Sequence, residues 1–176
     1  MGLVWYTGRG DSGRTSIPSA GEVWKDDDII EAIGDLDELN SVIGIVVSVY
    51  PKLKDELVEI QADIFTISSE LAGFNMGFNE SRLKHLEDLI AKYGSSLPLI
   101  TKFIFPGGHE ASAFLHLART VCRRSERKVV KLFRLNKAKE IHVKYLNRLS
   151  SLLFVLALWV NQVENVKNIE WMGKVK

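Results

Sequence analysis

The chain has 176 residues, of which 46% are hydrophobic and 26% are charged, so it is long enough for one domain with a sizeable core. This composition excludes a disordered, collagen-like or low-complexity protein. A formal net charge of +1 indicates no polyanionic partner for the molecule as a whole. The single cysteine cannot form a disulfide within the chain, and neither a leader peptide nor a membrane-spanning run is evident. We therefore expect a cytoplasmic protein with no membrane partner.

The predicted elements follow one another in a simple order. Glycine, serine and threonine are concentrated in residues 1–25, which predicts a loop rather than a helix. Beyond this loop, apolar residues recur at helical spacing. The pattern predicts five helices, over about residues 27–50, 53–73, 83–94, 111–133 and 139–163. We therefore predict an all-α protein, a five-helix bundle with an ordered N-terminal glycine-rich loop and no strand longer than a few residues.

Charge is distributed unevenly along this chain. Residues 115–148 contain eleven Lys and Arg against two Glu, an excess of nine positive charges. The remainder of the chain therefore carries an excess of eight negative charges, many of them in residues 26–38. The two segments could pair with each other, share a charged ligand, or form two separate faces exposed to solvent.

The most informative motif is the glycine-rich sequence YTGRGDSGRTS at residues 6–16. Glycine allows turns in which backbone N–H groups converge on an anion, and the neighbouring Arg, Thr and Ser add further donors. The glycine spacing matches the dinucleotide-binding fingerprint, but that motif requires a strand before it and a helix after it. Neither is predicted here, and the ending of a Walker loop is also absent. An anion-binding loop and a flexible tail remain the two interpretations.

Three arginines form a ridge on the fourth predicted helix. Arg119, Arg123 and Arg127 recur at every fourth residue, so they share one face. Their like charges require a negative partner, which Asp35, Asp37 or a bound triphosphate could supply. A ridge exposed to solvent and a nucleic-acid-binding face are the alternatives.

Motifs for other chemistries are missing. The chain has no Glu-x-x-His, no His-Glu-x-x-His and no Gly-x-Ser-x-Gly, and its four histidines lack metal-ligand spacing. We therefore predict no metal site built from protein ligands alone. Glu126, three residues after Arg123, could hold an arginine in place or help to bind Mg²⁺.

Four separated blocks together resemble the PduO-type ATP:cob(I)alamin adenosyltransferases. They are YTGRGDSGRT at 6–15, GDLDELNS at 34–41, FIFPGG at 103–108 leading into HLARTVCRRSER at 116–127, and YLNRLS at 145–150. The resemblance implies a five-helix bundle that forms a homotrimer with active sites between subunits. It also implies transfer of the 5′-deoxyadenosyl group of ATP to the cobalt of cob(I)alamin, with release of tripolyphosphate. Mg²⁺ would be required, and a corrinoid reductase would be a partner.

The same resemblance implies roles for individual residues. Arg123 matches an arginine on the phosphates, and Asn147 matches an asparagine on the nucleotide. Arg119 and Asp37 match an arginine–aspartate pair that bridges subunits near the corrinoid. Phe103 matches the aromatic residue that occupies the lower face of the corrin and excludes the axial base. The other predicted nucleotide-binding residues are Thr7, Gly8, Gly10, Asp11, Gly13, Arg14, Thr15, Ser16, Lys25, Glu126 and Arg127.

We accordingly expect one adenosyltransferase domain over residues 1–176, with a nucleotide-binding loop (1–25), a helical bundle (26–165) and a tail (166–176). Two rival hypotheses stay open at this point. One is a non-enzymatic helical module that binds nucleic acid through the basic fourth helix, with an affinity that falls steeply as salt is added. The other is a sensor that binds ATP and corrinoid without turnover.

Overall fold

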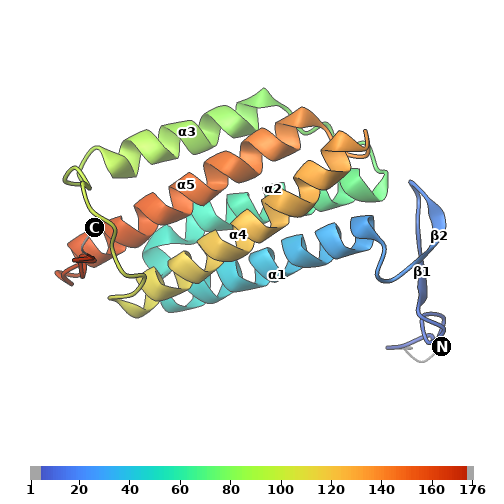
Figure 1. Ribbon diagram of the computed structural model, residues 1–176, viewed down its shortest axis with the longest axis horizontal. Helices are drawn as coiled ribbons and strands as arrows, with labels where there is room; N and C mark the ends of the chain where they lie inside the picture. The colour runs from blue at the N-terminus through green and yellow to red at the C-terminus, as the bar shows by residue number, and fades with distance from the viewer. Residues whose placement is uncertain (1–4, 174–176) are drawn as a thin grey trace.

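The computed structural model describes residues 5–173, and the five predicted helices are all present in that part of the chain (Figure 1). Residues 1–4 of the predicted loop and 174–176 of the predicted tail lie outside it. The observed bounds differ from the predicted ones by three residues or fewer, so the all-α bundle is confirmed. The helices are α1 (Asp28–Val49), α2 (Lys54–Ala72), α3 (Glu80–Gly94), α4 (Glu110–Arg134) and α5 (Glu140–Val163), with a 3-10 turn η1 (Pro51–Leu53) before α2.

A small β-hairpin lies inside the predicted N-terminal loop. Its strands β1 (Arg14–Ile17) and β2 (Gly21–Trp24) pair antiparallel. The strands have four residues each and no regular apolar alternation, so they give no periodic signal in the sequence. The prediction of a non-helical ordered segment is therefore right, and the hairpin is a refinement of it. Figure 1 shows the hairpin at one end of the bundle, next to the start of α1.

Local capping signals set the ends of the helices. The Asp27 side chain accepts a hydrogen bond from the backbone N–H of Ile29 and caps the start of α1. Gly73 ends α2 in the left-handed region, with φ 109°, where glycine is favoured. The Asn79 side chain caps α3 by accepting from the N–H of Ser81. These caps fix the points at which the chain leaves and enters the bundle.

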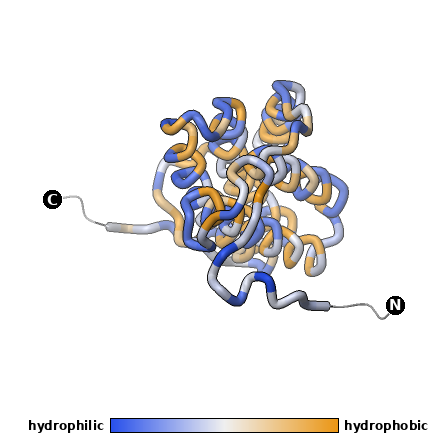
Figure 2. Tube along the Cα trace, turned by 90° about the vertical axis from the view of Figure 1, so that its right-hand side faces the viewer, coloured by the Kyte–Doolittle hydropathy of each residue, from blue (hydrophilic) through white to orange (hydrophobic). Residues whose placement is uncertain are grey.

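The core runs along the inner faces of all five helices. Helix α1 packs against α2 and α4, α4 packs against α5, and α5 packs against α3. Hydrophobic and hydrophilic residues alternate along each helix, as amphipathic helices require (Figure 2). By length and composition alone α5 could cross a membrane, but 56% of its most apolar window is buried inside the protein. That burial is typical of the core helix of a soluble bundle.

The C-terminal tail runs along the loop that precedes α4. The N–H of Phe105 donates to the carbonyl of Ile169 at 2.9 Å, and the N–H of Trp171 donates to the carbonyl of Phe103 at 2.8 Å. Ile104 and Glu170 form an isolated antiparallel bridge between these two hydrogen bonds. The tail, to which the sequence assigned no role, therefore supports the backbone of the Phe103 loop.

Candidate functional site

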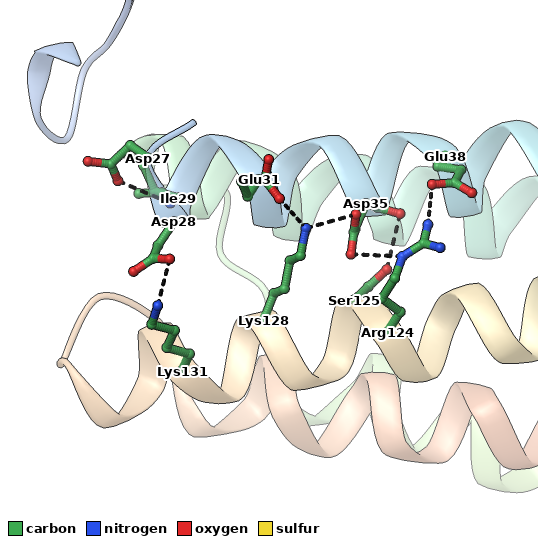
Figure 3. A network of polar contacts seen from close by, with 10 residues as sticks. All are labelled: Asp27, Asp28, Ile29, Glu31, Asp35, Glu38, Arg124, Ser125, Lys128 and Lys131. Atoms are coloured by element: carbon green, nitrogen blue, oxygen red, sulfur yellow. Dashed lines mark hydrogen bonds and ion pairs between the residues drawn. The ribbon is translucent and has the colours of Figure 1, made fainter. Parts of the chain in front are cut away.

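The acidic face of α1 and one face of α4 neutralise each other (Figure 3). Asp35 is central to these contacts because its nearly buried carboxylate accepts from Arg124 Nε at 3.1 Å and from Lys128 Nζ at 3.1 Å. Hydrogen bonds from Lys128 to Glu31 and Asp35 outweigh its partial burial and raise its pKa. The ion pairs are Lys131–Asp28, Lys128–Glu31, Lys128–Asp35, Arg124–Asp35 and Arg124–Glu38. The hypothesis that Asp35 is the negative partner of the arginine ridge is wrong, because Asp35 forms its ion pairs with Arg124 and Lys128.

The ridge arginines lie on a different face of α4. Within residues 5–173, Arg119, Arg123 and Arg127 form no ion pair with a carboxylate. Arg127 Nη1 donates to the carbonyl of Arg123 at 3.0 Å, and Arg119 Nε is buried without a hydrogen-bond partner among the described residues. The structure thus separates the basic helix into a neutralised face and a face with three cations still able to bind an anion. The proposal of a nucleic-acid-binding helix gains no support from this arrangement.

Two of the ridge arginines border a cavity between α4 and α5, which we call the α4–α5 cavity. It has a volume of about 300 Å³ and is lined by Arg123, Glu126, Arg127, Val130 and Asn147. Asn147 Nδ2 donates to Glu126 Oε1 at 3.1 Å, so the amide and the carboxylate hold each other in place across the helix pair. Four residues that the sequence selected from two separate motifs, 116–127 and 145–150, therefore meet in one place. Two guanidinium groups beside a carboxylate and an amide are suited to a polyphosphate with its cation.

A second cavity, the Phe103 cavity, has a volume of about 490 Å³. Phe103 lies at the edge of this cavity, and its side chain is 78% exposed. The ring of Trp171 packs edge-on against the Phe103 ring, with the two ring centres 6.1 Å apart. The guanidinium of Arg119 lies 6.0 Å from the centre of the Phe154 ring. Aromatic rings and two cations, Lys102 and Arg119, offer contacts to a large flat ligand. The lining residues are Ile100, Thr101, Lys102, Phe103, Ile104, Arg119 and Phe154.

Sequence reasoning missed Phe154 as a member of this group. Its position gave a usable signal, because it lies seven residues after Asn147 and therefore on the same face of α5. Lys102, which also lines the Phe103 cavity and pairs with Glu170 on the tail, gave none. Its position depends on the contact between the tail and the loop before α4.

A buried histidine lies beside the same aromatic ring. His116 is 3% exposed, packs edge-on against Phe154 at 5.9 Å, and has no hydrogen-bond partner for either ring nitrogen within the described chain. Burial, together with the nearby charge of Arg119, lowers its pKa to about 4. The imidazole is therefore neutral at pH 7 and adds no repulsion to Arg119. Burial and the neighbouring Arg123 also lower the pKa of Arg119, which favours an anionic partner there.

The glycine-rich loop is built from two consecutive turns. The N–H of Asp11 donates to the carbonyl of Gly8, and the N–H of Gly13 donates to the carbonyl of Gly10, each at 3.1 Å. Gly8 and Gly13 have positive φ values of 68° and 80°, so the backbone favours glycine at both. A Cβ atom at Gly10 would lie 2.7 Å from Lys25 Nζ, so that ammonium group lies directly against the loop. The structure therefore brings Lys25 and the glycine-rich loop together.

Other predicted loop residues have partners of their own. Arg14 Nε donates to Glu22 Oε2 at 2.8 Å, and its guanidinium lies 4.8 Å from the centre of the Trp24 ring. Thr15 and Ser16 are strand residues of β1, and Thr7 Oγ1 accepts from the N–H of Arg9 at 3.4 Å. Arg14 is thus held within the hairpin and would have to exchange Glu22 for a phosphate in order to bind it.

The structure does not bring all predicted residues together within one chain. No residue of segment 5–25 lines the α4–α5 cavity or the Phe103 cavity. The loop that carries Phe103 lies at the opposite end of the bundle from the hairpin (Figure 1). Asp37 lines a third cavity, of about 400 Å³, between α1 and α2, and within the described part of the chain it forms no ion pair with Arg119. We call it the α1–α2 groove; it also exposes Phe65 and Phe74.

Comparison with known proteins identifies the family. The family described as cobalamin adenosyltransferase matches residues 5–160. The cobalamin adenosyltransferase of Cupriavidus metallidurans is 39% identical over 94% of this chain and 92% of its own length. The corrinoid adenosyltransferase of Bacillus subtilis is 36% identical over 94% of this chain and 91% of its own length.

Solved structures agree with these sequence matches. A variant of the PduO-type ATP:corrinoid adenosyltransferase from Lactobacillus reuteri, complexed with cobalamin and ATP, superimposes with a TM-score of 0.91. It is 32% identical, and the match covers 96% of this chain and 99% of that one. Another variant of the same enzyme, complexed with ATP, gives a TM-score of 0.88 at 33% identity over 94% of this chain and 99% of that one. The chain therefore belongs to the cobalamin adenosyltransferase family.

Proposed function

We propose that this protein is an enzyme that transfers the 5′-deoxyadenosyl group of ATP to the cobalt of a reduced corrinoid. The proposal rests on the α4–α5 cavity, found in a chain that belongs to the cobalamin adenosyltransferase family. There, Arg123 and Arg127 have no carboxylate partner within residues 5–173 and lie beside the hydrogen-bonded pair of Glu126 and Asn147. A cob(I) corrinoid is itself a strong nucleophile, so the protein has to position ATP and stabilise the leaving group.

The expected chemistry explains why cations are needed. The electron pair of Co(I) forms a bond to C5′ of ATP while the C5′–O bond breaks, and tripolyphosphate leaves. Negative charge develops on the leaving oxygen, where Arg123 and Arg127 would stabilise it and Asn147 would orient the nucleotide. Lys25 and the backbone of the glycine-rich loop would bind the distal phosphates. Thr7, Gly8, Gly10, Asp11, Gly13, Arg14, Thr15 and Ser16 remain predicted members of that loop site.

Mg²⁺ fits this donor set as a companion of ATP. The described residues contain no group of three His, Cys, Asp or Glu side chains that could hold a metal ion by themselves. Mg²⁺ often binds through one or two carboxylates, several waters and the phosphates of a nucleotide. Glu126 would be the carboxylate in this case, and the ion would neutralise part of the triphosphate charge.

The Phe103 cavity is the proposed corrinoid site. The exposed ring of Phe103 would lie against the lower face of the corrin and exclude the axial base, with Arg119 at the same cavity. Loss of that axial ligand would ease reduction of Co(II) to Co(I). A separate corrinoid reductase would supply the electron, and a reducing cytoplasm is the compartment we propose.

We further propose that the active protein is a homotrimer with active sites between subunits. Two observations support it: the glycine-rich loop lies away from both cavities of its own chain, and Asp37 and Arg119 lack ion-pair partners in the described residues. Exposed Phe65 and Phe74 in the α1–α2 groove give an apolar surface for a neighbouring copy. Arg119 of one subunit would then pair with Asp37 of the next.

Arg123→Ala tests the role of the cavity. We expect kcat/KM for ATP to fall by about 10²–10³-fold, the usual cost of removing one donor to a developing anion. Arg123 is exposed and makes no ion pair in the described chain, so the thermal stability should not change. Arg134→Ala is the matched control, since it removes the same charge from the exposed end of the same helix. Equal activity in both variants would refute the assignment.

A further inference from the structure

The tip of the N-terminal hairpin contacts the end of α2. The backbone N–H of Ser19 donates to the carbonyl of Ala72 at 2.9 Å, and its hydroxyl donates to the carbonyl of Leu71 at 3.3 Å. Carbonyls in the last turn of a helix have no partner within the helix, so they are available to an outside donor. In the described chain, these are the two hydrogen bonds that join the hairpin to helices α2–α5.

This contact depends on glycine at the end of α2. Gly73 has φ 109°, and a Cβ atom there would lie 2.6 Å from the nitrogen and 2.9 Å from the Cα of Ser19. Backbone atoms cannot be displaced as easily as the end of a side chain, so any larger residue would push the hairpin tip away. Gly77 offers a close comparison, because its φ is 71° and a Cβ atom would meet nothing within 4 Å.

The hairpin is too small to hold its own position. A two-stranded hairpin of four-residue strands is marginally stable by itself and requires packing against the rest of the protein. Ile17, on β1, packs against the core of the bundle and supplies the apolar part of that support. The glycine-rich loop is joined to the base of the hairpin, where the N–H of Lys25 donates to the carbonyl of Gly13 at 2.9 Å. Movement of the tip would therefore displace the loop as well.

We infer that Ser19 and Gly73 form an anchor that fixes the hairpin, and with it the glycine-rich loop, relative to the helical bundle. They are positioning residues: neither is among the residues predicted to contact ATP, and each acts through the placement of the glycine-rich loop. The inference that this matters for ATP rests on the proposed function. Loosening the anchor should weaken ATP binding and leave the chemical step and the corrinoid site as they are.

Gly73→Ala tests the anchor, with Gly77→Ala as the matched control for the cost of a side chain at positive φ. In hydrogen exchange on the full-length protein, Gly73→Ala should speed exchange of the β1 and β2 amides by about tenfold or more, and Gly77→Ala should not. Gly73→Ala should also raise KM for ATP by about fivefold or more, while kcat at saturating ATP and KM for the corrinoid change less than about twofold. Ser19→Pro removes the N–H that donates to Ala72 without changing a residue of the bundle, and it should have the same effects. This variant provides the test if Gly73→Ala does not fold.

The outcomes separate the anchor from the proposed function. Equal hairpin exchange in the two glycine variants, or unchanged exchange in Ser19→Pro, would overturn the anchor. Faster exchange with no change in KM for ATP would overturn the part of the inference that concerns ATP. If the unmodified protein neither binds nor uses ATP, the proposed function fails, and hydrogen exchange still decides whether the anchor exists.

Discussion

The buried His116 makes a quantitative prediction about stability and pH. Its pKa is about 4 in the folded protein, against 6.5 for an unperturbed histidine, because burial and the charge of Arg119 disfavour the imidazolium. As pH falls from 6.5 towards 4, His116 binds a proton in the unfolded chain but stays neutral in the folded protein. Stability from this source is thus fully present above pH 6.5 and is lost as pH falls through the folded pKa. At about 1.4 kcal/mol for each pKa unit, the loss is about 3 kcal/mol.

His116→Phe removes this titration while keeping an aromatic ring against Phe154. Urea unfolding at several pH values between 7.5 and 4 measures the free energy of unfolding of both proteins. Across that range the unmodified protein should lose about 3 kcal/mol more than the variant. His142 and Glu70, whose pKa values are also lowered, destabilise both proteins equally at low pH and cancel in the comparison. Parallel pH profiles of the two proteins would contradict a lowered pKa of His116 in the folded state.

Two further predictions concern the carboxylates of α1. Asp35→Ala removes the nearly buried partner of Arg124 and Lys128 and should lower the free energy of unfolding by about 1–3 kcal/mol. Glu38→Ala removes a half-exposed carboxylate and should lower it by less than about 1 kcal/mol. Equal losses in urea unfolding would contradict the central place of Asp35. Asp37→Asn should weaken trimer assembly or corrinoid binding more than ATP binding, measured by analytical ultracentrifugation and by KM for each substrate. A variant that loses affinity for ATP alone would show that Asp37 does not pair across subunits.

The fold could be predicted from the sequence because its helices are long and regular. Helices α1, α2 and α5 carry apolar residues at helical spacing for about twenty residues each, and Pro51 and Gly73 mark where two of them stop. The hairpin could not be found in the same way. Its short strands depend on pairing with each other and on the contact of Ser19 with α2, which is distant in sequence.

The site was only partly predictable for a similar reason. Helical spacing places Arg123 and Arg127 on one face, but it does not say which cations of α4 are neutralised by α1. That division depends on how two helices pack, and it is the division that distinguishes Arg123 from its neighbour Arg124. The support of Phe103 by Trp171 depends on a tail more than 60 residues away in sequence, whose backbone pairs with the loop before α4.

The most direct test of the proposed function is anaerobic incubation of the protein with ATP, Mg²⁺ and chemically reduced cobalamin. The corrinoid absorption spectrum and the released tripolyphosphate are followed together. The proposed function predicts adenosylcobalamin and tripolyphosphate in equal amounts. ATP binding without turnover would contradict it and favour a sensor. Absence of ATP binding would also contradict the nucleotide site, because the arginines of the α4–α5 cavity would then bind another ligand.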